Sequence, residues 1–124
     1  MIKGIEHFGL VAKDVQTLSR WYCDMFGMRV ALSTPSGAVF LQGQNGVNIE
    51  VYKARSEAVA ADYYSPGLRH IAILVQDIAG ERARLAAKGL SIEAEIASNP
   101  GFRIVRFTDP EGNLGHLVER DTPL

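Results

Sequence analysis

Apolar and polar residues follow one another along this chain in a pattern that occurs twice. Residues 5–14 and 68–77 are short apolar runs, each with one histidine near its start and an aspartate seven residues after that histidine. The two runs begin 63 residues apart, about half of the 124-residue chain. Self-similarity at such an offset indicates repeated structural units. The sequence therefore predicts two tandem copies of one unit, over residues 5–53 and 68–120.

A buried strand is predicted at the start of each copy, since a short apolar run fits a strand better than a helix. A helix is predicted next. Asp14 and Asp77 are suited to accept hydrogen bonds from the free N–H groups of a first helical turn. Gly27 and Gly89 are suited to end the helices, because glycine adopts left-handed backbone angles without a Cβ penalty. Apolar residues recur at helical spacing in between: Val15, Leu18, Tyr22 and Met25 in one copy, Ile78, Leu85 and Ala86 in the other.

Three further strands are predicted after each helix, separated by turns rich in glycine, proline and asparagine. They cover residues 29–33, 38–42 and 47–52 in the first copy, and 91–97, 103–108 and 114–119 in the second. Each copy is thus a βαβββ unit. The predicted fold class is α+β, with the two units forming a curved, mixed sheet around a central cleft. The segment 53–67 has no clear strand pattern and fits a linker, a short helix or a flap over a pocket.

Composition limits the possible classes. With 124 residues and 47% apolar content, the chain suits one domain over residues 1–124 whose halves share a core. Thirteen basic and fourteen acidic residues without charge blocks argue against nucleic-acid and membrane partners and favour a small-molecule substrate. Cys23 is the one cysteine, and no apolar run approaches the length of a membrane span. A cytoplasmic location is therefore expected.

Polar residues interrupt the predicted strands at matched positions in the two copies. His7 and His70 are equivalent on the first strand of each copy, and Glu50 and His116 are nearly equivalent on the last. An unpaired carboxylate buried in such a strand would cost several kcal/mol. If the two sheets curve around a common centre, the four side chains could meet and offer three imidazoles and one carboxylate to a divalent ion.

The order of motifs resembles the vicinal oxygen chelate superfamily, which includes glyoxalase I, extradiol dioxygenases, and fosfomycin and bleomycin resistance proteins. The resemblance rests on the motif His-x-x-Leu-Val-x-x-Asp from His7, Trp21-Tyr22 with residues 26–28, residues 69–72, and the turn Asp-Pro-Glu-Gly-Asn at 109–113. It implies a single divalent metal ion (Ni, Co, Zn, Mn or Fe) and a homodimer. The implied metal ligands are His7, Glu50, His70 and His116.

One ligand position departs from the pattern of the better-known members. Glyoxalase I and the dioxygenases have a glutamate where this chain has His116. Glu119 cannot replace it, because strand alternation places Glu119 on the opposite face. Glu50 is then the only carboxylate ligand able to move a proton, which makes it the candidate catalytic base. Arg103 and Arg106 lie three residues apart on one strand, so only one of them can face a pocket and bind an anion.

The resemblance leaves three functions open. The first is a metal-dependent lyase or isomerase of glyoxalase type, acting on a small oxygenated metabolite that chelates the ion through adjacent oxygens. Glutathione is disfavoured, because Val11 and Ala54 occupy the positions that would hold its glutamyl end. The second is a non-haem iron dioxygenase, since two histidines and one carboxylate suit Fe(II). The third is a binding or resistance protein without turnover.

Overall fold

Each half of the chain forms its own sheet and helix, as the repeat predicts. The computed structural model describes residues 1–93 and 101–124, and the chain divides into two compact units, Met1–Ala58 and Val59–Leu124. The boundary falls inside the segment 53–67, which contains neither helix nor strand beyond the end of the strand at Lys53. The segment therefore links the two units.

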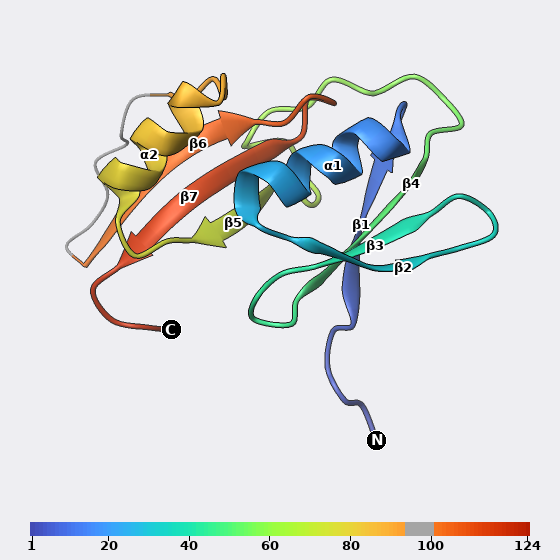
Figure 1. Ribbon diagram of the computed structural model, residues 1–124, viewed down its shortest axis with the longest axis horizontal. Coiled ribbons are helices and arrows are strands. Elements are labelled where there is room, and N and C mark those ends of the chain that lie inside the picture. Colours follow the sequence, from blue (N-terminus) through green and yellow to red (C-terminus); the bar gives the residue numbers. More distant parts are fainter. Residues whose placement is uncertain (94–100) are drawn as a thin grey trace. The chain divides into compact units, whose positions relative to one another are not determined.

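The first unit is a four-stranded mixed sheet with one helix (Figure 1). Its strands have the order β1-β4-β3-β2, with β1 parallel to β4 and the other neighbours antiparallel. The helix packs on the sheet through Val15, Leu18 and Tyr22, which are buried together with Leu41 and Val51. In chain order the elements are β1 (His7–Ala12), α1 (Val15–Phe26), β2 (Arg29–Ser33), β3 (Val39–Gln42) and β4 (Asn48–Lys53).

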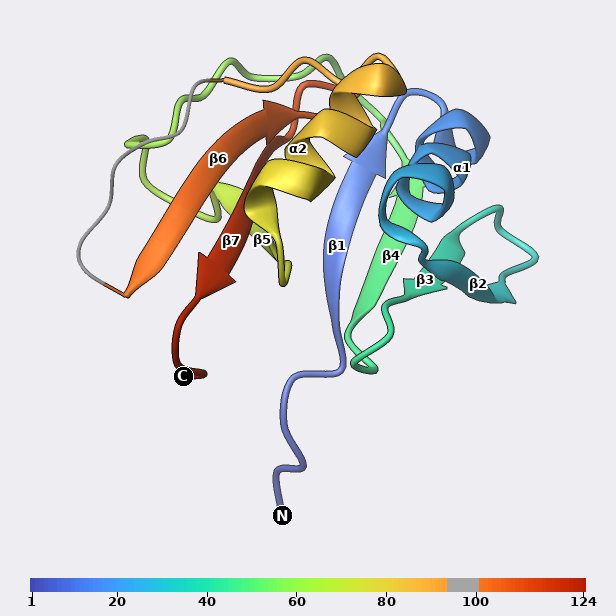
Figure 2. The same cartoon turned by 60° about the vertical axis from the view of Figure 1, so that its left-hand side comes forward.

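The second unit repeats this arrangement with three named strands. Their order is β5-β7-β6, with β5 parallel to β7 and β6 antiparallel to it. Figure 2 shows the helix α2 along β6 and β7, where Ile78, Leu85, Val105, Phe107 and Leu117 form the core. The elements are β5 (His70–Leu74), α2 (Ile78–Ala87), β6 (Phe102–Thr108) and β7 (Leu114–Arg120).

The strand predicted over residues 91–97 is seen only at its start. Ile92 forms an isolated antiparallel bridge with Phe107. The rest of that predicted strand, from residue 94 onward, and the first two residues of the Asn99-Pro100-Gly101 turn lie outside the described residues.

The predicted ends of the helices are confirmed. Asp14 accepts a hydrogen bond from the Thr17 amide at 3.0 Å, and Asp77 accepts one from the Gly80 amide at 3.0 Å. The backbone angle φ is +64° at Gly27 and +87° at Gly89, where a side chain would be strained. Neither described helix has the length and apolar character needed to cross a membrane.

The prediction that the first strand of each copy is buried is wrong. Each strand begins at its histidine, and β1 and β5 are edge strands of their own sheets, with one neighbour each. In β1 only Ala12 is buried, and in β5 Leu74 is 70% exposed. An apolar run fixes strand propensity, whereas burial depends on which strands flank it, and this is a property of the tertiary structure.

Candidate functional site

The two sheets place the four candidate ligands at equivalent positions. In the β1–β4 ladder, Glu50 lies two residues beyond the residue that pairs with His7. In the β5–β7 ladder, His116 lies two residues beyond the residue that pairs with His70. Side chains two residues apart on a strand point to the same face. The repeat in the sequence is therefore also a repeat in strand register, and each unit carries one pair on a single sheet face.

The first pair is an imidazole held between carboxylates. His7 Nε2 lies 3.3 Å from Glu50 Oε2, and the two side chains are 35% and 27% exposed. The other ring nitrogen, Nδ1, contacts the Glu6 carboxylate. The hydrogen bond with Glu6 raises the pKa of His7, and the charges of Glu6 and Glu50 add to that effect. Both side chains of the pair are therefore partly accessible to a ligand from solvent.

The second pair consists of two stacked imidazoles without a carboxylate between them. The ring centroids of His70 and His116 lie 4.1 Å apart, at an interplanar angle of 23°. His116 Nε2 is buried and has no hydrogen-bond partner among residues 1–93 and 101–124. Burial, as the largest cause, and the proximity of His70 and Arg106 together lower the pKa of His116 from 6.5 to about 4. At neutral pH His116 is therefore a neutral imidazole.

These donors fit a divalent metal ion. Metal–nitrogen and metal–oxygen bonds of about 2.1 Å at a tetrahedral or right angle place two donor atoms about 3.0 to 3.4 Å apart. The 3.3 Å between His7 Nε2 and Glu50 Oε2 lies in this range. A buried imidazole nitrogen without a partner is an unusual cost, and a metal ion bound at His116 Nε2 would remove it. Imidazole and carboxylate together suit Zn, Fe, Ni, Co and Mn.

The structure brings the predicted ligands together as two pairs, one in each unit. Among residues 1–93 and 101–124, no three or more histidine, cysteine, aspartate and glutamate side chains are grouped so as to hold a metal ion. A single site built from all four residues therefore stays a prediction.

Glu119 lies on the sheet face opposite His116, as strand alternation predicts. In the antiparallel β6–β7 ladder Glu119 is paired with Arg103, and the two side chains form an ion pair. Glu119 Oε2 also accepts a hydrogen bond of 2.7 Å from the Ile78 amide at the start of α2. Glu119 therefore makes its contacts on the face of the sheet that the helix covers.

Tyr63 was not singled out by the sequence pattern, yet it contacts the imidazole pair. Its ring stacks on His116 with centroids 5.0 Å apart and an angle of 26°, and its hydroxyl donates to the Gly115 carbonyl at 3.1 Å. Tyr63 belongs to the linking segment, where no periodicity indicates a contact. Only the aromatic pair Tyr63-Tyr64 in a polar stretch could have pointed to a packed side chain.

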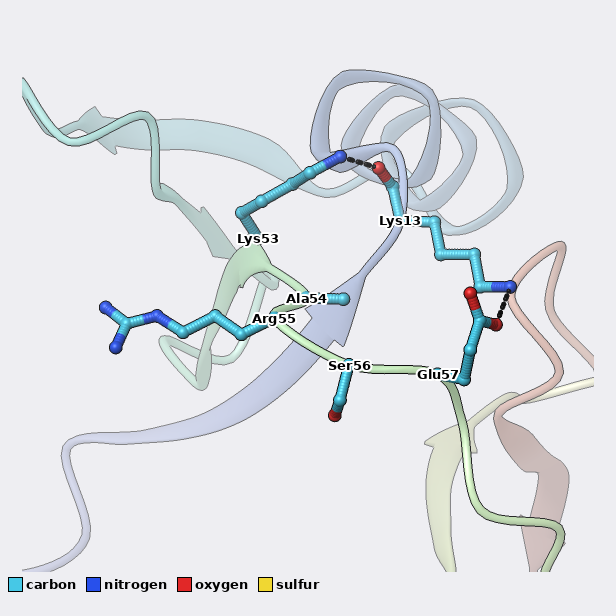
Figure 3. Close-up of a pocket in the computed structure, with 6 residues that line it drawn as sticks. All are labelled: Lys13, Lys53, Ala54, Arg55, Ser56 and Glu57. Atoms are coloured by element: carbon cyan, nitrogen blue, oxygen red, sulfur yellow. Dashed lines mark hydrogen bonds and ion pairs between the residues drawn. The ribbon is translucent and has the colours of Figure 1, made fainter.

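A separate open pocket of about 350 Å³ lies in the first unit where the parallel strands β1 and β4 end (Figure 3). Its two lysines already have partners: Lys13 pairs with Glu57 at 2.6 Å, and Lys53 donates to the Lys13 carbonyl. Arg55 points away from them (Figure 3). The lining also contains Ala54, and neither His7 nor Glu50 contributes to it. The pocket is therefore distinct from the first ligand pair.

Comparison with known proteins gives one family. The model of the Glyoxalase/Bleomycin resistance protein/Dioxygenase superfamily matches residues 4–117. Protein YwbC of Bacillus subtilis is 27% identical, over 97% of this chain and 100% of its own length.

Solved structures give the same fold. The fosfomycin resistance protein FosX of Listeria monocytogenes is 24% identical, with a TM-score of 0.78 over 96% of this chain and 94% of FosX; another of its structures contains Mn(II) and sulfate. The oxidase ChaP-H2 is 24% identical, with a TM-score of 0.76 over 97% of this chain and 95% of the oxidase. With its two βαβββ-type units and a family match over almost its whole length, the chain belongs to the Glyoxalase/Bleomycin resistance protein/Dioxygenase superfamily.

Proposed function

We propose that this protein is a metal-dependent lyase or isomerase of glyoxalase type, acting on a small oxygenated metabolite. The proposed ligands of one divalent ion are His7, Glu50, His70 and His116. The observation that carries the proposal is the buried Nε2 of His116, which has no hydrogen-bond partner in the described part of the chain. His116 lies at the strand position equivalent to Glu50. A metal ion bound at Nε2 would explain why a neutral imidazole without a partner occupies this repeated polar position.

The proposed chemistry is proton transfer next to a carbonyl group. When bound, a divalent ion supplies Lewis-acid stabilisation of negative charge on a substrate oxygen. Glu50 is the only carboxylate among the four proposed ligands, and its side chain is 27% exposed, so it can accept a proton from substrate. His7 holds that carboxylate from the neighbouring strand at 3.3 Å. His116, with its pKa lowered to about 4, is a neutral donor at neutral pH and does not compete with Glu50 as an acid.

The relatives support two parts of this proposal, the divalent metal ion and the small-molecule substrate. One structure of FosX was determined with Mn(II), and another, of a FosX mutant, with Mn(II) and 1S,2S-dihydroxypropylphosphonic acid, a molecule with two adjacent hydroxyl oxygens. A second relative is named as an oxidase. A dioxygenase is disfavoured for this chain, because the related dioxygenases supply a carboxylate where it has His116.

The test is proton exchange measured together with metal content. Protein purified without chelators is analysed for bound metal, then incubated in D₂O with a panel of small α-hydroxycarbonyl compounds, and deuterium incorporation is followed by NMR. We expect one ion per chain, and exchange that is lost in Glu50→Gln. Tyr64→Phe is the matched control, because Tyr64 is 85% exposed and outside the proposed site. Absence of metal from the wild-type protein, or iron with O₂ uptake and no exchange, would contradict the proposal.

We further propose that the protein is a homodimer, as the family resemblance implies. The edge strands carry exposed apolar side chains, including Phe8 and Val11 on β1 and Leu74 on β5, which suits them to contact a partner surface. Sedimentation over a range of concentrations tests this. A monomer at every concentration would contradict it.

A further inference from the structure

Arg106 lies directly beside the imidazole pair of the second unit. In the antiparallel β6–β7 ladder it is the cross-strand partner of His116, so the two side chains share a sheet face. Its guanidinium carbon lies 4.2 Å from the centroid of the Tyr63 ring. Of the two arginines on β6, Arg106 therefore faces the candidate site, whereas Arg103 faces the helix-covered side.

The equivalent position in the first unit shows that the fold does not require a cation here. Phe40 is the cross-strand partner of Glu50, in the same register as Arg106 opposite His116. The Phe40 ring contacts His7 edge-on, with centroids 5.2 Å apart. One unit thus combines a carboxylate with an apolar ring, and the other combines an imidazole with a guanidinium. The cross-strand pair of the second unit therefore carries a positive charge, on Arg106, and that of the first unit carries a negative one, on Glu50.

The charge of Arg106 is not neutralised by the described part of the chain. No carboxylate among the described residues forms an ion pair with Arg106, and its Nε is buried without a hydrogen-bond partner. Arg103, on the same strand, is paired with Glu119. A partly buried guanidinium without an anion is costly, and contact with an aromatic face offsets only part of that cost.

Tyr63 fixes the position of this guanidinium. Its hydroxyl is bonded to the Gly115 carbonyl at 3.1 Å, its ring stacks on His116, and Arg106 lies over the same ring. Tyr63 is therefore tied to the strand that carries His116 and holds Arg106 close to it. Pre-positioning of this kind lowers the entropy cost of binding an anion.

We propose that Arg106 binds an oxyanion group of the substrate, a carboxylate or a phosphate-type group, with Tyr63 as the residue that positions it. This inference rests on the proposed function, because it places the anion next to two of the proposed metal ligands. The planar fork of a guanidinium matches both carboxylate and phosphate oxygens. The substrate class then narrows from a small oxygenated metabolite to an acid or phosphate-bearing one.

The test is binding of simple oxyanions to metal-stripped protein, followed by NMR of the arginine Nε–H and histidine signals. The probes are inorganic phosphate and acetate in separate titrations, which distinguish the two oxyanion types. We expect Arg106 and His116 signals to shift with at least one probe. A charged hydrogen bond contributes about 1.5–3 kcal/mol, so Arg106→Gln should weaken binding by about 10- to 100-fold. Arg103→Gln removes the same charge from the other face and should leave binding unchanged.

Two variants of Tyr63 test whether its aromatic ring positions the Arg106 guanidinium. Tyr63→Phe keeps the ring beneath Arg106 and should retain most of the oxyanion affinity, whereas Tyr63→Leu removes the aromatic face and should lose it. Unchanged affinity in Arg106→Gln, or no shift of the Arg106 signal with either probe, would overturn the inference. Metal content is measured on the same samples before stripping. Arg106-dependent oxyanion binding in a protein that takes up no metal would contradict the proposed function and leave this inference standing.

Discussion

His116 stacks on His70 with ring centroids 4.1 Å apart, and its Nε2 is buried without a hydrogen-bond partner among the residues that the structure describes. His7, at the position equivalent to His70, has a carboxylate partner on each side. The two halves of the chain thus present one repeated geometry with opposite electrostatics. This difference determines how His116 and His7 each respond to pH.

The metal-free protein should lose stability as the pH falls from about 6.5 to 4, and His116 should contribute to that loss. Its pKa is lowered from 6.5 to about 4, so in this window the unfolded chain takes up a proton that the folded chain does not, and unfolding is favoured. Urea unfolding at several pH values measures the effect. We expect a smaller slope in His116→Leu. An unchanged slope would show that His116 is not desolvated as described.

His7 should act in the opposite direction. Its pKa is raised by the hydrogen bond with Glu6, so its contribution to stability is complete below its ordinary pKa of 6.5 and is lost as the pH rises through the raised value. In His7→Gln, chelator-treated protein should lose less stability than the wild type between neutral and mildly alkaline pH. Glu6→Gln should have the same direction of effect. Equal pH profiles for wild type and both variants would contradict the described pair.

Gly115 should be intolerant of a side chain. A Cβ at this position would overlap the ring of Phe107, its cross-strand partner on β6. Overpacking of a filled core costs about 1–3 kcal/mol, so Gly115→Ala should lower the free energy of unfolding by at least that amount. Adding Phe107→Leu should recover part of the loss, because the smaller side chain makes room. Purely additive effects in this double-mutant cycle would argue against the contact.

Removal of the Glu119 carboxylate should lower the free energy of unfolding. Its Oε2 accepts the Ile78 amide at 2.7 Å at the first turn of α2, and its lowered pKa is due to that bond first and to Arg103 second. Glu119→Ala leaves the amide without a partner and should cost about 1–3 kcal/mol. Glu119→Gln keeps an acceptor and should cost less. Urea unfolding of the two variants, at a pH where Glu119 is ionised, distinguishes these outcomes.

The sequence was sufficient for the repeat, the fold class and the helix ends, because each depends on local chemistry. Asp14 and Asp77 cap helices in any context that frees the first-turn amides, and period-two alternation correctly separated Glu119 from His116. The equivalence of Glu50 and His116 followed from the repeat and is now seen in the strand register.

The features that the sequence did not predict depend on neighbours in the tertiary structure. The first strand of each copy looked buried because its residues are apolar, yet β1 and β5 lie at sheet edges, and no local pattern specifies an edge. Tyr63 lies in a segment without periodicity, so its contact with His116 could not be inferred. The equivalence of Phe40 and Arg106 was within reach, since these residues are separated by the same 66 positions as Glu50 and His116, but their cross-strand pairing is seen only in the structure.

Metal binding by a small set of variants tests the central claim, that His116 is a metal ligand. The measurement is stoichiometry and affinity for Mn(II) and Zn(II) by calorimetry, on wild type, His116→Ala, His116→Glu and Glu119→Gln. We predict one ion per chain in the wild type. His116→Ala should lose more metal affinity than the factor of about 10 to 100 that is typical of residues that only support a ligand. Affinity should return in His116→Glu and be unchanged in Glu119→Gln. Wild-type affinity in His116→Ala together with a loss in Glu119→Gln would contradict the proposed site.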